Sequence, residues 1–578
     1  MLKDCIEIFE KELLLKGDKL IIDNYLPSDG TYVIVSIEDD KFFIKEAFDI
    51  KYNKKSDEIE GRENIYFKEV CEYDYNSKLI DMNKPIDIKK IIQSNNYLSF
   101  FVKKESIGNK KLTNEIIDNY YKVLSNPKLK YTETKAKEIY NSIEQSIPQI
   151  DQEFLKKIQS WIKENIFELD NLGIEIKGKD YLKIFFEAPI QTYINEGKRY
   201  LIPNIYNKNE FNQILSNEIY GVPNNNLGLN PKKPYLENKS RKLKVPCLLN
   251  EAEVLLQKKF FDYMLSLASK GKVNIYINDE GIRAFKNDEM IDKDFTGIYL
   301  RIKKGKEVEI QSYDLITSYK YLLKNRFELK NVLELSDDYI VNEYTKYGDR
   351  KNLQLVISNI LFSKYLVNNY FTDEKDISIK DNTLKKNLLI SRDKIFDYTY
   401  KGNENGIYEL LNKVSLDLIK NNIANGYIIK ASHQYNMRCS LENYFKGGVN
   451  MADLIYDMKN NLREKINAKD TQSIESDKEY YFAVGQFVNF LLSKSKSKNK
   501  LHSLANPFIN AKSDKVIKEK LRNIYKRYNY DIDMYSKRVN NIYAMIVSYE
   551  TQGKVDQDMI IAGYLHSNLI YEGKKGEE

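Results

Sequence analysis

Thr31-Tyr-Val-Ile-Val-Ser-Ile37 is a run of β-branched and aromatic residues, followed by Glu38-Asp39-Asp40 and then Lys41-Phe-Phe-Ile-Lys-Glu-Ala-Phe-Asp-Ile-Lys-Tyr52. Two such runs joined by a short acidic turn predict a β-hairpin. The preceding residues, Met1 to Lys16, have the charge pattern of an amphipathic helix and lack the apolar centre of a signal peptide. The N-terminal region is therefore expected to be mixed α/β.

Working outward, residues 111–170 have the pattern of helices and end near Trp161, whose face with Ile158 and Ile162 predicts core packing. A hairpin with a cationic tip, Lys303-Lys-Gly-Lys306, is also expected. From about 312 to 440 the pattern predicts helices. The strands expected after the first hairpin are Tyr181–Phe186, Tyr200–Ile202, Lys272–Ile277, Thr296–Ile302 and Glu307–Ile310.

The last 130 residues have the periodicity of a helical bundle. Met451, Ile455, Met458, Leu462 and Ile466 follow i, i+3/4, i+7 spacing, which places one apolar face on a helix. Ser476-Asp-Lys-Glu479 is a capping box that opens the next helix. Three more helices with apolar faces follow, centred on residues 516–528, 539–546 and 558–569, and short helices of this kind imply a compact bundle.

The fold class expected from these patterns is α+β. A mixed α/β N-terminal region is followed by a helical region and a C-terminal α-helical bundle. At 578 residues the chain should split into several domains. The expected division is a mixed α/β domain over 1–110, an α/β region carrying a basic loop over 111–330, a helical region over 331–446 and the bundle over 451–578.

Composition excludes several classes of protein. The chain is 42% apolar and 30% charged, with a net charge of +7, and no run approaches the length of a membrane span. The four cysteines, Cys5, Cys71, Cys247 and Cys439, include no C-x-x-C pair, so neither a zinc ribbon nor a redox motif is indicated. A reducing cytoplasm fits this usage.

Histidine is scarce, and this argues against a metal-dependent enzyme. His433, His502 and His566 are the only three, none is followed by Asp and none belongs to H-E-x-x-H. There is also no phosphate-binding G-x-x-x-x-G-K-[ST] motif. Acid pairs such as Asp39/Asp40 are expected in turns. The chain is therefore predicted to bind rather than catalyse, with no cofactor, no metal site and no catalytic residues.

Residues 228–246, Gly-Leu-Asn-Pro-Lys-Lys-Pro-Tyr-Leu-Glu-Asn-Lys-Ser-Arg-Lys-Leu-Lys-Val-Pro, carry six cations and one acid. Three prolines favour a loop over a helix. Cations beside an aromatic ring are what a nucleic-acid backbone and an unstacked base require. The alternative is a solvated surface loop. The predicted phosphate contacts are Lys232, Lys233, Lys239, Arg241, Lys242 and Lys244, with Tyr235 as a stacking platform.

The run Asn224, Asn225 and Asn226 precedes this loop. The side-chain amides could hydrogen-bond to the edges of bases in a DNA groove. A run of Asn is explained at least as well by a turn, in which Asn is a favoured residue. Asn95 and Asn96 present the same choice, with the turn favoured.

A second basic surface is predicted on the bundle. Residues 491–540 hold 13 Lys and Arg against 4 Asp and Glu. A helical face rich in cations suits non-specific contact with the backbone of single-stranded nucleic acid. An ordinary surface helix whose lysines are simply solvated explains the same composition equally well. The residues expected to contact nucleic acid here are Lys494, Lys496, Lys498, Lys500, Arg522, Lys526 and Arg527.

Several segments together resemble the large subunit of the type I-B CRISPR Cascade surveillance complex. They are Ser94-Asn-Asn-Tyr-Leu-Ser-Phe-Phe-Val-Lys-Lys104, the basic loop 230–246, Tyr200-Leu-Ile-Pro-Asn-Ile-Tyr-Asn-Lys-Asn209, His502-Ser-Leu-Ala-Asn-Pro-Phe508 and Ala562-Gly-Tyr-Leu-His-Ser-Asn-Leu-Ile-Tyr-Glu572. The likeness runs from the first helix to the last, and no single motif in it is diagnostic alone.

The resemblance implies a non-catalytic subunit of an antiviral defence complex. Such a subunit caps one end of a guide-RNA particle near the 5′ handle of the RNA. It inspects target double-stranded DNA for a protospacer-adjacent motif and helps to recruit a helicase-nuclease, while guide pairing reads the sequence. Its partners would be the guide RNA, the target DNA, the other Cascade subunits and the helicase-nuclease, with no membrane. Two alternatives stay open: a nuclease with a carboxylate metal site, and an RNA-binding structural protein outside CRISPR defence.

The segment Lys446-Gly447-Gly448-Val449-Asn450-Met451 precedes the bundle. Its codons can read AAAGGAGGT, a strong bacterial ribosome-binding sequence, with Met451 at suitable spacing. The hypothesis is that Met451 is an internal start that releases residues 451–578 as a small subunit, as the resemblance also suggests. The alternative is a Gly-Gly linker between domains, and both can hold.

Overall fold

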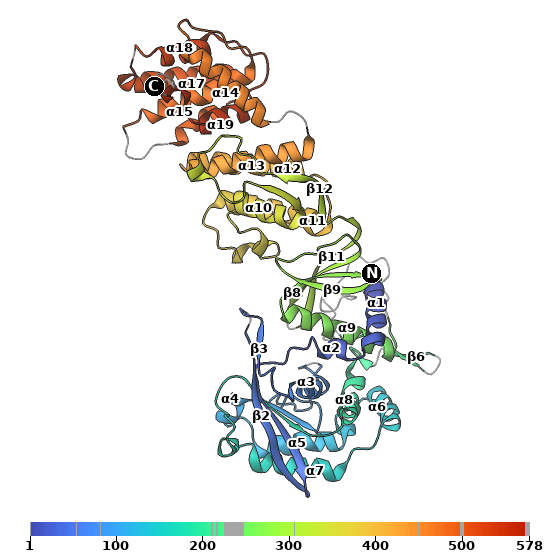
Figure 1. The fold of residues 1–578 in the computed structure, drawn as a ribbon. Helices are drawn as coiled ribbons and strands as arrows, with labels where there is room; N and C mark the ends of the chain where they lie inside the picture. The colour runs from blue at the N-terminus through green and yellow to red at the C-terminus, as the bar shows by residue number, and fades with distance from the viewer. Residues whose placement is uncertain are drawn as a thin grey trace. The chain divides into compact units, whose positions relative to one another are not determined.

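The structure is a computed structural model that describes residues 2–53, 55–80, 82–209, 212–215, 218–224, 248–305, 307–447, 451–496, 502–533 and 535–572. The chain divides into two compact units. The first comprises Met1–Asn287 with Gly297–Leu315, and the second Asp288–Thr296 with Ile316–Glu578. The N-terminal region is mixed α/β and the C-terminal region is helical, as the sequence predicts (Figure 1). The domain boundaries expected at 110, 330 and 446 stay predictions.

A five-stranded sheet forms the centre of the N-terminal region, in the order β3-β2-β1-β5-β4. The predicted hairpin is confirmed, because β1 and β2 pair antiparallel around Asp39 and Asp40, which have φ values of 48° and 64°. Two residues with positive φ give the tight turn that suits the strand twist. The strands are β1 (Gly30–Glu38), β2 (Lys41–Asn53), β3 (Glu58–Glu60), β4 (Ser99–Lys103) and β5 (Tyr181–Phe186).

Helices pack around this sheet (Figure 1). Trp161 belongs to their core, with its ring edge-on to Phe186 at a centroid distance of 5.5 Å, so its predicted packing role is confirmed. The helices of the N-terminal region, of which α1 and α6 pack in other apolar clusters, are α1 (Leu2–Lys16), α2 (Lys19–Ile22), α3 (Phe67–Ser77), α4 (Lys104–Gly108), α5 (Asn114–Ser125), α6 (Thr134–Ser146), α7 (Gln152–Asn165) and α8 (Ile190–Leu201).

The strand expected at Tyr200–Ile202 is wrong. Tyr200 and Leu201 end helix α8. Tyr193, Gly197 and Tyr200 are buried at helical spacing, so the relevant apolar period is that of the whole helix rather than of the last three residues. Pro203 follows at once and marks the end of the helix.

A second sheet has the order β11-β10-β8-β9, and helices α1 and α9 (Glu251–Ser269) share its core. The strand predicted at Lys272–Ile277 and the neighbouring pair around Lys303–Lys306 are confirmed. The strands are β8 (Lys272–Asn278), β9 (Gly281–Lys286), β10 (Phe295–Lys304) and β11 (Val308–Tyr319). Two further short strands, β6 (Gln213–Leu215) and β7 (Glu218–Tyr220), pair with each other.

The helical region begins later than expected. Residues 312–349 include the end of β11 together with β12 (Leu322–Glu328) and β13 (Lys346–Asp349), so the helices predicted there are wrong. In β12 only Leu323 and Phe327 are buried, and so few apolar residues leave no clear strand pattern in the sequence. Four helices then follow: α10 (Arg350–Phe362), α11 (Asn382–Lys401), α12 (Ile407–Ala424) and α13 (Ile428–Lys446).

The five bundle helices predicted from periodicity are confirmed, and a short helix, α16 (Asn506–Ile509), joins them. The hydroxyl of Ser476 accepts the backbone N–H of Glu479, while the Glu479 carboxylate accepts from Glu475 instead of closing the box. The bundle shares one apolar core with α12 and α13. Its helices are α14 (Met451–Asn467), α15 (Asp477–Ser493), α17 (Asp514–Tyr528), α18 (Lys537–Ser548) and α19 (Gln557–Leu565).

Candidate nucleic-acid interface

Helix α17 presents cations on the face opposite its buried side. Ile517, Leu521 and Tyr528 are buried and fix the orientation of the helix. At 100° per residue, the residues most nearly opposite them are Glu519, Lys526, Lys515 and Asn523, with Arg522 at the edge of this face, and all five are exposed. Three of these five side chains are positive and one is negative, so the outer face of α17 carries a net positive charge.

These cations have no charge partner among the described residues. The side chains of Lys515, Arg522 and Lys526 make no hydrogen bond or ion pair with any residue that the structure describes, and the same is true of Arg527. Lys518, on the flank of the same helix, differs because it lies 3.2 Å from the Asp514 carboxylate. The outer face is therefore free to attract an anion, whereas Lys518 is held in the fold.

Lys496, in the segment after α15, contacts residues that follow the end of α17. Its ammonium lies 4.8 Å from the ring centroid of Tyr530 and 3.9 Å from the Asp531 carboxylate. Tyr530 follows α17 directly and is 57% exposed. Because Lys526 and Arg527 belong to the last turn of α17, this corner combines cations with an accessible aromatic ring.

Lys494 forms a similar cation–aromatic group at the C-terminal cap of α15. Its ammonium lies 5.0 Å from the ring centroid of Phe490 and 5.4 Å from that of Tyr571, which is 53% exposed. Tyr530 and Tyr571 were not among the residues predicted from the sequence. Tyr530 could have been found from its position three residues after Arg527, but Tyr571 comes close to Lys494 only through the fold.

The structure describes only part of the predicted site. Lys494, Lys496, Arg522, Lys526 and Arg527 are described, and all belong to α15, α17 or the segment that follows α15. The residues that lie outside the described part of the chain are Lys232, Lys233, Tyr235, Lys239, Arg241, Lys242, Lys244, Asn225, Asn226, Lys498 and Lys500.

Asn224 is buried and hydrogen-bonded to a distant segment of backbone. It is 2% exposed, its backbone N–H donates to the carbonyl of Ile205 at 2.7 Å, and its side-chain amide donates to the carbonyl of Asn204 at 3.1 Å. Asn95 and Asn96 are also buried, and their amides donate to the carbonyls of Lys78 and Tyr193. The three side-chain amides thus donate to backbone carbonyls within the fold.

Two further findings bear on the chemistry available. Within the described ranges, no three His, Cys, Asp or Glu side chains come close enough together to hold a metal ion. Nor does any helix in that part of the chain have the length and apolar character needed to cross a membrane. In comparisons with protein-family models, curated proteins and solved structures, nothing matched this chain.

Proposed function

We propose that this protein is a nucleic-acid-binding, non-catalytic large subunit of a type I-B CRISPR effector complex that acts in the cytoplasm. The observation that carries the binding part of the proposal is the outer face of α17, where Lys515, Arg522 and Lys526 have no partner among the described residues. The assignment to a Cascade complex rests on the resemblance of the quoted segments, which extends along the chain.

The proposed contact is with the phosphate backbone of a single strand. Arg522 and Lys526, one helical turn apart on α17, would neutralise neighbouring phosphates and release their counterions. Tyr530 would accept an unstacked base on its exposed face, because an aromatic ring stacks on any base without selecting its sequence. Such a surface binds without reading sequence, which suits a complex in which guide pairing provides the specificity.

The basic loop 228–246 would supply a second contact region. Its six cations and Tyr235 have the composition of a strand-binding loop. In the proposed assembly, one of these two surfaces, the loop or the outer face of α17, binds the guide RNA and the other binds the target DNA. Recognition of the protospacer-adjacent motif and recruitment of the helicase-nuclease belong to the same proposal.

The experiment that tests the assignment is purification of the tagged full chain from cells that contain its gene neighbourhood, followed by sequencing of the bound RNA. The proposal predicts a short RNA that begins with repeat-derived sequence, together with the other subunits. An RNA population without repeat sequence would instead favour an RNA-binding protein outside CRISPR defence. Cleavage of DNA by the purified chain with magnesium, lost on acid-to-Ala substitution, would favour a nuclease.

A further inference from the structure

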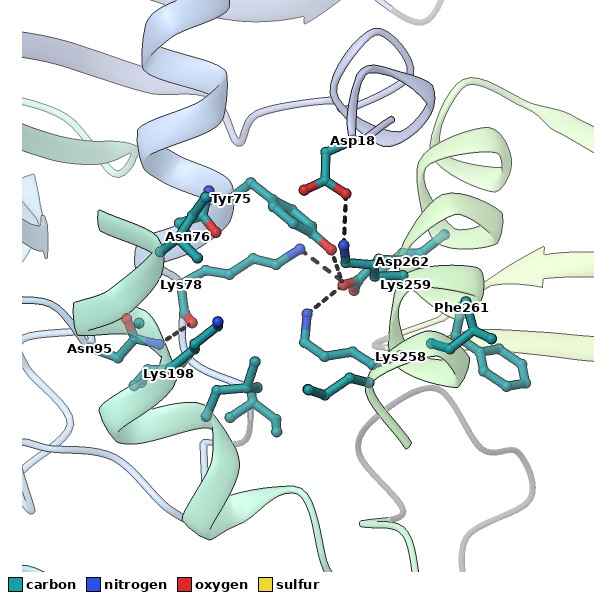
Figure 2. Close-up of a pocket in the computed structure, with 18 of the residues that line it drawn as sticks. Asp18, Tyr75, Asn76, Lys78, Asn95, Lys198, Lys258, Lys259, Phe261 and Asp262 are labelled. Carbon is teal, nitrogen blue, oxygen red and sulfur yellow. Dashed lines mark hydrogen bonds and ion pairs between the residues drawn. The ribbon is translucent and has the colours of Figure 1, made fainter. Parts of the chain in front are cut away.

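A cavity of about 840 Å³ lies in the N-terminal unit, between the end of α3, helix α8 and helix α9 (Figure 2). About half of its lining residues are apolar, among them Leu79 and Ile80 after α3, Leu201 on α8, and Leu255 and Phe261 on α9. Ligand pockets of this size and character hold small organic molecules through a few placed polar groups. The polar groups of this cavity are mostly charged.

Asp262 on α9 is the centre of the charged group. Its carboxylate lies 2.5 Å from the ammonium of Lys258 and 3.6 Å from that of Lys78, and it accepts a hydrogen bond of 2.9 Å from the Tyr75 hydroxyl. Burial alone would raise the pKa of Asp262, but Lys258 and Lys78 outweigh burial and hold this pKa at about 2. Asp262 is therefore an anion that holds two ammonium groups in place.

Four lysines and three acids, Asp18, Asp262 and Glu307, line the cavity. Lys259 pairs with Asp18 at 2.7 Å, so that pair is balanced. Asp262 is shared by Lys78 and Lys258, and burial lowers the pKa of Lys78. Lys198 on α8 lines the same cavity and makes no hydrogen bond or ion pair with any described residue. Its charge acts on Glu251 of α9, where it offsets part of the rise that burial causes in the pKa of that carboxyl.

The side chains converge on one space. In Figure 2, three ammonium groups point toward the middle of the cavity. They belong to Lys78 in the segment after α3, Lys198 on α8 and Lys258 on α9. A second cavity of about 560 Å³ shares Lys78 and Asp262 with the first, and Tyr25, Tyr52 and Tyr181 line it. The charged centre is thus bordered by apolar and aromatic walls on both sides.

We infer that this cavity binds a nucleoside 5′-phosphate, with the phosphate at Lys198 and Lys258 and the base against the apolar wall of α9. Ammonium groups bind phosphate as point charges, and Lys198 offers one without breaking an ion pair, while Lys258 would share its ammonium between the phosphate and Asp262. A bare phosphate would leave most of an 840 Å³ apolar-walled cavity unfilled, whereas a nucleotide supplies both an anion and a flat organic body. The ligand is either a free mononucleotide or the 5′-terminal nucleotide of a strand.

Equilibrium dialysis of the full chain tests the inference. The probes are the four ribonucleoside 5′-monophosphates, the matching nucleosides, and a dinucleotide with either a 5′-phosphate or a 5′-hydroxyl. We expect at least one monophosphate to bind and its nucleoside to bind at least about tenfold more weakly, because a hydrogen bond to a charged group is lost. Tighter binding of the 5′-phosphorylated dinucleotide than of the monophosphate identifies a strand end as the source, and the reverse identifies a free nucleotide.

Two variants locate the site. Lys198→Ala should weaken monophosphate binding at least about tenfold, and Lys198→Gln, which keeps most of the side-chain stem, should do the same. Lys122→Ala removes an exposed lysine of α5 and should leave binding unchanged. The inference is overturned if no monophosphate binds at millimolar concentration, if the nucleosides bind equally well, or if both Lys198 variants match the parent protein.

The inference is independent of the proposed function. The variant Arg522→Ala/Lys526→Ala/Arg527→Ala alters only the bundle, so it should keep full monophosphate binding. If the parent chain binds a strand but no monophosphate, the cavity inference has failed, whereas monophosphate binding without strand binding means that the proposed function has failed.

Discussion

At the scale of residues, Asp262 shows what the sequence could and could not provide. The cations of α17 were predicted because charge in one segment is visible as a run, and the turn at Asp39 and Asp40 was predicted from its acidic residues. Lys78, Lys198 and Asp262 come from three distant segments that only the fold brings together around one cavity. The nucleotide cavity therefore had no signal in the sequence.

Asp262→Asn should destabilise the N-terminal unit by about 1–3 kcal/mol, because two partly buried ammonium groups lose their carboxylate. Urea unfolding followed by circular dichroism measures this loss. Asp279→Asn, at an exposed position, is the matched control and should change the free energy of unfolding by less than about 0.5 kcal/mol. Equal stability of the two variants would contradict the role given to Asp262.

The pH dependence of stability follows from the same carboxylate. Because its pKa in the folded protein is about 2 and its ordinary value is 3.8, Asp262 stabilises the folded state above pH 3.8. This contribution, about 2 kcal/mol, is lost as the pH falls from 3.8 toward 2. Between pH 4 and pH 2 the parent protein should lose more stability than Asp262→Asn, and parallel curves would count against the ion pair.

At the scale of elements, the sequence predicted the helices of the bundle but not how closely two of them approach. A Cβ atom on Gly563 of α19 would lie 2.1 Å from the carbonyl oxygen of Phe482 on α15, and one on Gly485 of α15 would lie 2.2 Å from that of Ile560. Periodicity reveals which face of a helix is apolar, but close contact of two backbones leaves no periodic pattern. The strands β12 and β13 were not predicted either, because so few of their residues are buried that no alternating apolar pattern is visible in the sequence.

Gly563→Ala should therefore lower the stability of the C-terminal unit by about 1–3 kcal/mol, because backbone atoms rather than a flexible side chain must move. Thermal unfolding monitored by circular dichroism provides the measurement. The control is Gly348→Ala in β13, where an added Cβ meets no atom within 4 Å and should cost little. If Gly563→Ala unfolds at the parent temperature, α15 and α19 do not approach as described.

At the scale of the whole molecule, the bundle is tied to the helices before it. The guanidinium of Arg438 on α13 donates to both carboxylate oxygens of Asp558 on α19, each at 3.0 Å, and the Tyr435 hydroxyl donates to the Asp558 carbonyl. A product of residues 451–578 made from Met451 would lack Arg438 and Tyr435. It would therefore expose the part of α19 that packs on α13 in the full chain.

The internal-start hypothesis predicts such a product. Synonymous changes to the wobble bases of the codons for Gly447 to Val449 should abolish it while leaving the full-length chain intact, because only ribosome binding is altered. Immunoblotting with a C-terminal tag detects both chains. A C-terminal fragment of unchanged abundance would contradict the hypothesis.

The central claim is that unpaired cations of the bundle bind the backbone of a strand, and the salt dependence of binding tests it most directly. Fluorescence anisotropy of a labelled single-stranded RNA should give a linear fall of log affinity with log salt for the parent chain. Arg522→Ala/Lys526→Ala/Arg527→Ala should reduce this slope by about 2, since each phosphate contact contributes about 0.7. The control Lys375→Ala/Lys380→Ala/Lys386→Ala removes the same charge from exposed positions outside the bundle and should keep the parent slope. Identical slopes for the two triple variants, or no RNA binding by the parent chain at low salt, would contradict the claim.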